Sequence, residues 1–471
     1  LGSMFPESGG MSRYAQYSHG PLLGFIAAWA NWISLVTLVP MEAVAAVQYM
    51  SSWPWSWANW TKNFIKNGDI TFEGIGVVFI FMLIFTMINF WSVKIMTHFT
   101  NLISIFKILL PTLTIVTLIC SGFHEHNFGT NIHEFMPYGS RSIFEATSVS
   151  GIIMSYDAFQ TIINMGGELK NPRKNIVRGV LISMLITAAI YIMLQVTFIG
   201  AVEPSMLAKV GWHGIDFTSP FADLAILMGI NWLVILLYLD AFVSPFGTGV
   251  AFVATASRAL AAMTHTRHLP KWLGRINQKY MIPRYAMATD LILAVILVSL
   301  FRNWNLLATV ITASTLIAYL TGPVTVMTLR KIRPDLARPF KPRYMPWLAP
   351  IAFVLTSLAI YWSMWPTTIQ VILVIALGLP IYFYYEIRYQ HSDLKKQLHN
   401  CWWMIGYLIF MSFMSYIGSN GFGGQNWIKY PFDFVVIIVV SLLFYYWGVK
   451  SGRDQLDPYA EHIIQNKNKQ K

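Results

Sequence analysis

The sequence predicts an all-α integral membrane protein with twelve membrane spans. Of its 471 residues, 55% are apolar and only 11% are charged, whereas an ordinary soluble domain carries about 25% charged residues. The mean hydropathy is +0.52. The apolar runs are long and lack strand alternation, which indicates helices of about 20 residues each rather than a barrel. A soluble core cannot account for this composition.

The spans follow from the apolar runs in chain order. A charge-free run begins at Pro21 and extends to Met41, and the apolar span continues to Met50. A tryptophan-rich loop follows it, as is typical of a membrane interface. The next spans are predicted at 74–93, 99–121, 143–164, 178–202, 224–257, 285–301 and 304–329. The charge-free stretch 347–385 is too long for one crossing, so we expect Trp365-Pro366 to divide it into two. The last two spans are predicted at 402–419 and 432–449.

Lys and Arg are distributed unequally between alternate loops. One set of loops holds 26 of the 33 basic residues and the other set holds 6, while Lys107 lies inside a span. Because cytoplasmic loops carry the basic excess, we expect both chain ends in the cytoplasm, across a bacterial inner (cell) membrane. This bias explains the net charge of +12 without a nucleic-acid partner.

Signatures of enzyme chemistry are absent from the sequence. It contains no Walker loop, no CxxC and no HExxH. We therefore expect no enzymatic activity, no cofactor and no metal site. A multi-span protein without a nucleotide site is predicted to be a secondary transporter or a channel.

The predicted span at 143–164 carries polar residues where lipid favours Leu and Val. A carboxylate at this depth is costly and normally faces a cavity or a partner. A span interrupted in its middle is a candidate for a broken helix that lines a substrate site. We expect this site to be lined by Ser150, Gly151, Met154, Ser155, Tyr156 and Asp157. For Asp157, substrate contact, proton acceptor, helix cap and a merely buried carboxylate all remain open.

A second candidate site combines charged and hydroxyl residues of two spans. Lys107 lies within the span at 99–121, where an unpaired ammonium is costly, so it is either a proton-coupling group or a structural hydrogen-bond donor. In the span at 224–257, Asp240 precedes Pro245, and Ser244 and Thr248 share one helix face. These groups can hold a cation or meet Lys107, or they can reflect a simple proline kink.

Four stretches of the chain resemble amino acid permeases of the amino acid–polyamine–organocation superfamily. They are FPESGGMSRYAQYSHGPLLGF at 5–25, TNLISIFKILLP at 100–111, GIIMSYDAFQTIINMGGELKNPRKNI at 151–176 and LDAFVSPFGTGVAFVATASRALAAM at 239–263. The sequence departs from the family pattern in the third stretch. Its acidic residue is Asp157, whereas the family places one at the position of Gln160, and Gly167 precedes Glu168 where two Glu are usual.

The resemblance implies a LeuT-type inverted-repeat fold. It assigns residues 1–329 to a transporter core of the third to tenth family helices, 330–449 to additional membrane helices and 450–471 to a cytoplasmic tail. FPESGG marks the end of the family's second helix, so the first helix and most of the second are expected to be missing. A full-length relative would then have 14 spans.

The resemblance also implies a function. We expect proton-coupled amino acid symport by alternating access, because in some proton-coupled members a lysine at the position of Lys107 replaces a sodium ion. Ser244 and Thr248 fall near the matching hydroxyl region. The alternatives are an amino acid or amine exchanger in which Lys107 is structural, and a non-transporting truncated fragment. Some relatives carry aspartate with protons, but the sequence indicates neither the substrate nor the oligomeric state.

Overall fold

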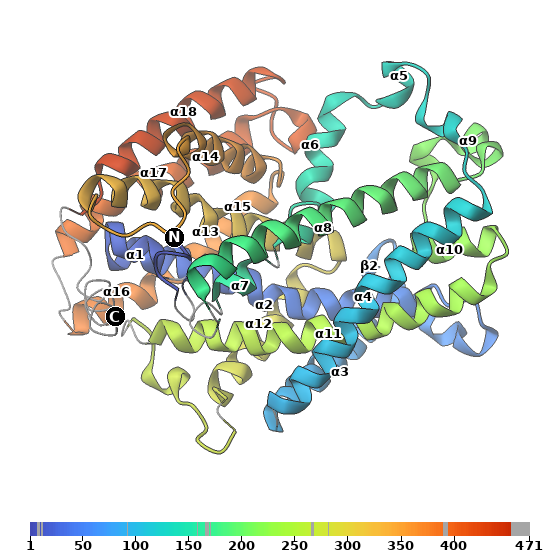
Figure 1. Cartoon of the computed structure of the whole chain (residues 1–471), viewed down its shortest axis with the longest axis horizontal. Coiled ribbons are helices and arrows are strands. Elements are labelled where there is room, and N and C mark those ends of the chain that lie inside the picture. The colour runs from blue at the N-terminus through green and yellow to red at the C-terminus, as the bar shows by residue number, and fades with distance from the viewer. Residues whose placement is uncertain are drawn as a thin grey trace.

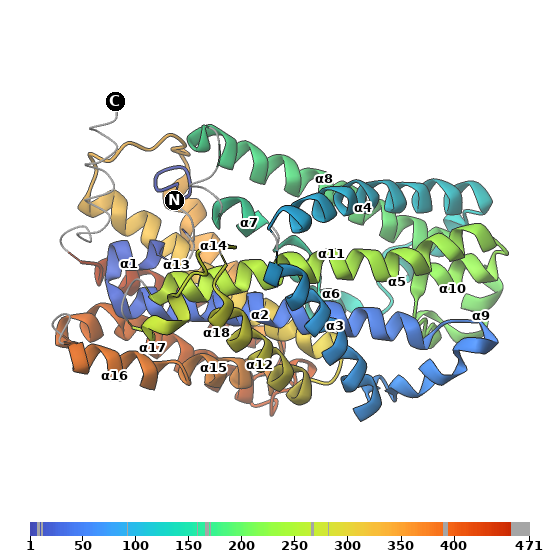
Figure 2. The same cartoon turned by 90° about the horizontal axis from the view of Figure 1, so that it is seen from below.

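The computed structural model shows an almost entirely helical protein (Figures 1 and 2). The structure describes residues 1–6, 10, 13–91, 93–157, 159–164, 169, 171–264, 268–280, 282–389 and 394–453. Gly167, Glu168 and the predicted tail beyond 453 lie outside the described residues.

The helices and strands occur in the following order. They are α1 (Tyr14–His19), α2 (Pro21–Ser51), η2 (Ser56–Phe64), β1 (Ile65–Lys66), β2 (Asp69–Ile70), α3 (Phe72–Trp91), α4 (Val93–Ser121), η3 (Glu125–Phe128), α5 (Ile132–Phe135), α6 (Gly139–Val149), η4 (Met154–Tyr156), α7 (Phe159–Asn164), α8 (Pro172–Ala201), α9 (Pro204–Val210), η5 (Trp212–Gly214), α10 (Pro220–Leu227), α11 (Asn231–Met263), η7 (Lys271–Gly274), α12 (Arg284–Leu300), α13 (Trp304–Ile332), α14 (Met345–Tyr361), α15 (Thr367–Ala376), α16 (Leu379–Tyr389), α17 (Leu394–Ile417), η8 (Asn420–Phe422) and α18 (Phe432–Lys450).

The prediction of an all-α membrane protein is confirmed. Among the described residues, eight helical segments are long and apolar enough to cross a membrane, with α15 and α16 taken together. Trp365-Pro366 separates α14 from α15, as expected. The predicted span at 143–164 is interrupted in its middle, between α6 and α7.

The predicted start of the span at 224–257 is wrong. The chain forms α10 first, turns at Gly229 with a φ of +73°, and begins α11 only at Asn231. A positive φ suits glycine and stops a right-handed helix. Because Gly229 lies among apolar residues, hydropathy alone did not reveal this boundary.

Two triplets of helices make matching contacts. α2 packs against α3, α12 and α13, while α11 packs in the same way against α12, α3 and α4. Exchanging α2 with α11, α3 with α12 and α4 with α13 therefore reproduces the same set of neighbours. α2 and α11 also pack against each other and run in opposite directions (Figures 1 and 2). This reciprocity is what an inverted repeat requires.

Helix α2 forms the centre of the molecule. Its apolar stretch is fully enclosed by other helices, which suits a helix that is hydrophobic on all sides. Few polar residues interrupt it. The hydroxyl of Ser34 bonds that of Thr315 on α13 at 2.5 Å, and Asn31 lies one helical turn away, almost fully buried.

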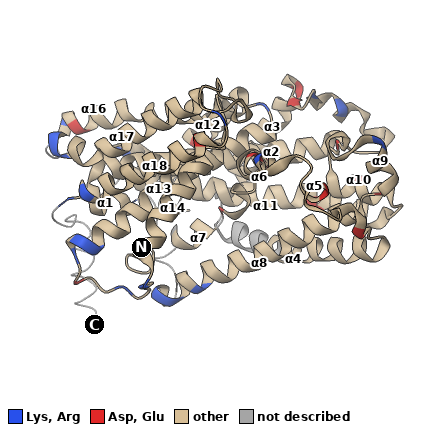
Figure 3. Ribbon diagram, turned by 90° about the horizontal axis from the view of Figure 1, so that it is seen from above, with Lys and Arg blue, Asp and Glu red and all other residues tan. Residues whose placement is uncertain are grey.

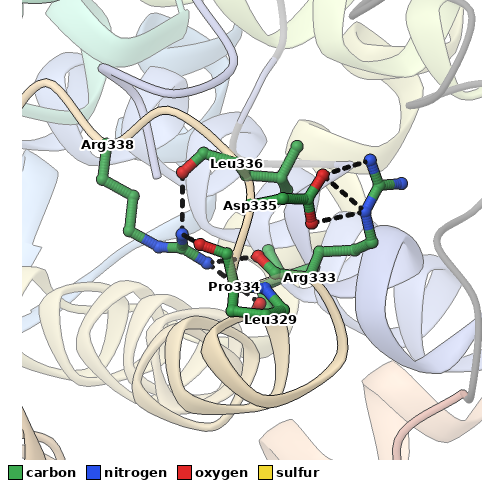
Figure 4. A network of polar contacts seen from close by, with 6 residues as sticks. All are labelled: Leu329, Arg333, Pro334, Asp335, Leu336 and Arg338. Atoms are coloured by element: carbon green, nitrogen blue, oxygen red, sulfur yellow. Dashed lines mark hydrogen bonds and ion pairs between the residues drawn. The ribbon is translucent and has the colours of Figure 1, made fainter.

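Basic residues gather at the end of the molecule that holds both described chain ends (Figure 3). Arg338 at this end closes the C-terminus of α13 (Figure 4). Its guanidinium donates to the carbonyls of Leu329 at 3.0 Å, Arg333 at 2.7 Å, Pro334 at 3.0 Å and Leu336 at 2.7 Å. The last carbonyls of a helix have no partner within it, so a cation that bonds them stabilises the helix end.

A salt bridge lies beside this helix end. Arg333 bonds the Asp335 carboxylate at 2.8 Å, and this guanidinium holds the pKa of Asp335 below its ordinary value.

Candidate functional site

The break between α6 and α7 is fixed by its backbone and by one aromatic ring. Helix α6 ends at Val149, and Gly151 follows with a φ of +78°. A Cβ atom at Gly151 would lie 2.8 Å from Cη2 of Trp304, the first residue of α13. Glycine is therefore needed here both for the backbone conformation and for the close approach of α13.

The predicted substrate-site residues at the break have different surroundings. Ser150 is exposed, whereas Gly151 is buried and Met154 is half-buried. The Ser155 hydroxyl donates to the carbonyl of Ile152 at 2.7 Å. The ring of Tyr156 meets that of Tyr191 on α8 edge-on, with centroids 5.6 Å apart.

Asp157 faces the interior of the protein. It is 4% exposed and accepts a hydrogen bond from the Thr315 hydroxyl of α13. Tyr319, one turn further along α13, is in electrostatic contact with it. The structure thus separates Asp157, buried against α13, from the exposed Ser150.

Lys107 and Thr248 are brought together across two helices. The Lys107 ammonium of α4 donates to the Thr248 hydroxyl of α11. The same hydroxyl donates onward to the carbonyl of Ser244 at 3.1 Å, one turn earlier in α11. Thr248 therefore uses one lone pair and its single proton, and it bridges the ammonium to the backbone just before Pro245.

Lys107 lines a cavity of about 330 Å³ that also contains two carboxylates. Asp240 and Ser244 line it from α11, and Glu42 lines it from α2. Both Glu42 and Asp240 lie close enough to Lys107 for their charges to interact. The volume is at the lower end of the roughly 300–1,000 Å³ typical of ligand pockets.

The two candidate sites do not share one cavity. The residues that line the cavity around Lys107 include none of those at the break. The break packs on α13, whereas Lys107 and Thr248 join α4 to α11. Helix α2 packs against both α11 and α13, so it lies between the two sites.

Three groups that the structure places at these sites were not among the site residues predicted from the sequence. Glu42 was visible as a carboxylate two residues after Pro40, within the first predicted span. Thr315 and Tyr319 lie in the hydroxyl-rich TASTLIAY of α13, which was a usable signal. Their contact with Asp157 depends on how distant helices pack, so the sequence did not indicate which residue these hydroxyls would contact.

A bundle of membrane helices with reciprocal halves, a broken helix and a half-buried lysine is typical of a transporter. The family model for amino acid permeases matches residues 1–372. The chain therefore belongs to the amino acid permease family, within the amino acid–polyamine–organocation superfamily, and is an amino acid transporter.

Two curated proteins of Bacillus subtilis (strain 168) are similar over nearly the whole chain. The glutamate/serine transporter AimA is 49% identical over 452 residues, which are 96% of this chain and 84% of the relative. The aspartate-proton symporter is 33% identical over 457 residues, 96% of this chain and 86% of the relative. The branched-chain amino acid permease BcaP is 24% identical over 410 residues, 84% and 82% of the two chains.

Proposed function

We propose that this protein imports an amino acid together with a proton by alternating access, with Lys107 as the coupling group. The observation that carries the proposal is the bond from Lys107 to Thr248 beside a cavity with two carboxylates. If the Lys107 ammonium alternates between the neutral Thr248 hydroxyl and the acidic Glu42 and Asp240, it can release and regain a proton during a transport cycle. The aspartate-proton symporter among the relatives supports the same coupling.

The substrate we propose is a glutamate, serine or aspartate molecule. This choice rests on the names of the two most similar relatives described above. Within the protein, we propose that Ser150, Gly151, Met154, Ser155 and Tyr156 line the amino acid site through the open backbone of the break. Asp240, Ser244 and Thr248 are assigned to the coupling site with Lys107.

The orientation and the division of the chain are part of the proposal. The basic residues at the end with both termini (Figure 3) favour a cytoplasmic location for that end, in a bacterial cell membrane. The transporter core would comprise residues 1–329, with additional membrane helices at 330–449.

The test is uptake by the Lys107→Met variant in proteoliposomes. Lys62→Met, an exposed lysine of the loop after α2, is the matched control. With one coupled proton, an inward gradient of one pH unit should concentrate the amino acid about tenfold. Wild type and Lys62→Met should reach this ratio, and Lys107→Met should only equilibrate its substrate.

Exchange is the second candidate function. It is favoured by the bond to Thr248, because a lysine held this way also serves as a fixed link between α4 and α11. Accumulation by Lys107→Met equal to wild type would reject the coupling role. Counterflow into preloaded vesicles without any pH gradient would then identify an exchanger.

A further inference from the structure

A second ionisable group is buried within the protein, outside the cavity around Lys107. Asp157 is 4% exposed, and Thr315 supplies its hydrogen bond. Its Oδ2 atom has no partner among the described residues. In that part of the chain, Tyr319 is the titratable group in electrostatic contact with it, and no Lys, Arg or His is.

The surroundings of Asp157 are polar but uncharged. Ser34 of α2 bonds Thr315 at 2.5 Å. Because the Thr315 hydroxyl contacts both Ser34 and Asp157, the two hydroxyls form a chain that ends at the carboxyl group.

Several further polar atoms near this chain lack partners within the described structure. Gln160 follows Asp157 by three residues, is 0% exposed and has both amide atoms unpaired. Asn31, three residues before Ser34, is 1% exposed with both amide atoms unpaired, and the Tyr319 hydroxyl is also unpaired. The hydroxyls of Ser34 and Thr315 therefore place polar groups of α2 and α13 on the side of the carboxyl group.

We propose that Asp157 is a second proton-binding site, separate from Lys107, which is protonated while α7 is seated on α13. This inference rests on the proposed function and deepens it, since it names another group that takes up a proton. An ionised carboxylate without a cation is strongly disfavoured out of water. The neutral carboxylic acid keeps an acceptor oxygen for Thr315 and gains an O–H donor of its own.

The position of Asp157 links this proton to a movement. Asp157 lies directly between η4 and α7, so its side chain is anchored at the edge of the break. The ring of Phe159 packs on Tyr319 with centroids 5.4 Å apart and holds α7 against α13. Loss of the proton would leave a carboxylate that gains free energy by reaching water, which requires α7 to separate from α13.

The first measurement detects the proton directly. Infrared difference spectra of the purified full chain at about pH 7, wild type minus Asp157→Asn, should contain the C=O band of one carboxylic acid. Glu125→Gln, an exposed carboxylate in the loop after α4, is the control and should lack this band. A carboxylate band in the Asp157 difference spectrum would overturn the proposal.

The second measurement follows thermal stability without substrate. A carboxyl group neutral in the folded state and ionised in the unfolded state, above about pH 4, lowers stability as the pH rises, by up to tenfold in the folding equilibrium per pH unit. The Tm of wild type should therefore fall relative to that of Asp157→Asn between about pH 5 and about pH 8. Glu125→Gln should stay parallel to wild type.

A Tm difference that is constant or grows with pH would overturn the proposal. A sodium effect would also overturn it. If replacing choline chloride by sodium chloride raised the Tm of wild type but not that of Asp157→Asn, the site would hold a sodium ion. Neither measurement involves transport or Lys107. A failure here is therefore distinct from a failure of the proposed coupling through Lys107.

Discussion

Replacing Gly151 by alanine should destabilise the broken helix for two reasons that can be measured separately. The φ of +78° places an L-residue in a conformation that costs roughly 1–2 kcal/mol. The new Cβ would lie 2.8 Å from Cη2 of Trp304, and relieving such overpacking costs about 1–3 kcal/mol. The expected total loss of unfolding free energy is about 2–5 kcal/mol.

Gly139 provides the matched control for the backbone cost. Its φ is +72°, and nothing lies within 4 Å of the Cβ that alanine would add. Gly139→Ala should therefore lose only about 1–2 kcal/mol. The double variant Gly151→Ala with Trp304→Leu removes the ring that alanine would meet, but it also loses the packing of Trp304 itself. The alanine substitution should therefore cost less in the Trp304→Leu background than in wild type.

Equilibrium unfolding in mixed detergent micelles gives the free energies, and uptake in proteoliposomes shows whether the break is needed for transport. Equal losses for Gly151→Ala and Gly139→Ala would refute the argument, because the approach of Trp304 would then impose no constraint. An alanine cost unchanged by Trp304→Leu would refute the assignment of the extra loss to that ring.

Two further substitutions test single contacts. Thr248→Val removes the acceptor of Lys107 and should cost about 1.5–3 kcal/mol more unfolding free energy than Thr255→Val. Thr255 is the control because its hydroxyl only bonds a carbonyl one turn earlier, that of Ala251, at 2.9 Å. Equal losses would show that the bond to Lys107 contributes nothing. Arg338→Ala should speed hydrogen exchange at the Arg333 amide, which bonds the carbonyl of Leu329 at the end of α13. Arg343→Ala, at an exposed arginine, should leave this exchange unchanged. Unchanged exchange in Arg338→Ala would reject the capping role.

Most of the helices could be predicted because a bilayer demands long apolar runs. The division at Trp365-Pro366 was predictable for the same reason, since one crossing cannot use 39 residues without charge. The break in the span at 143–164 was also visible, because serine, glycine and aspartate are costly at that depth. The turn at Gly229 was not, because a positive φ leaves no trace in hydropathy.

The candidate sites were predictable residue by residue but not as contacts. Lys107 and Thr248 each stood out in their own spans, yet 141 positions separate them. Asp157 was identified as anomalous, but its partners Thr315 and Ser34 come from α13 and α2. Such contacts are set by how α2 packs between two other helices, and a single sequence carries no direct signal for that packing.

The reciprocal contacts of the two helix triplets have an energetic consequence. If one triplet can adopt the arrangement of the other, the molecule has two shapes built from nearly the same set of interhelical contacts. The free energies of two such shapes then differ only through the few interhelical contacts that the two halves do not share. A bound amino acid or proton that prefers one shape by a few kcal/mol is then enough to decide which of them is populated.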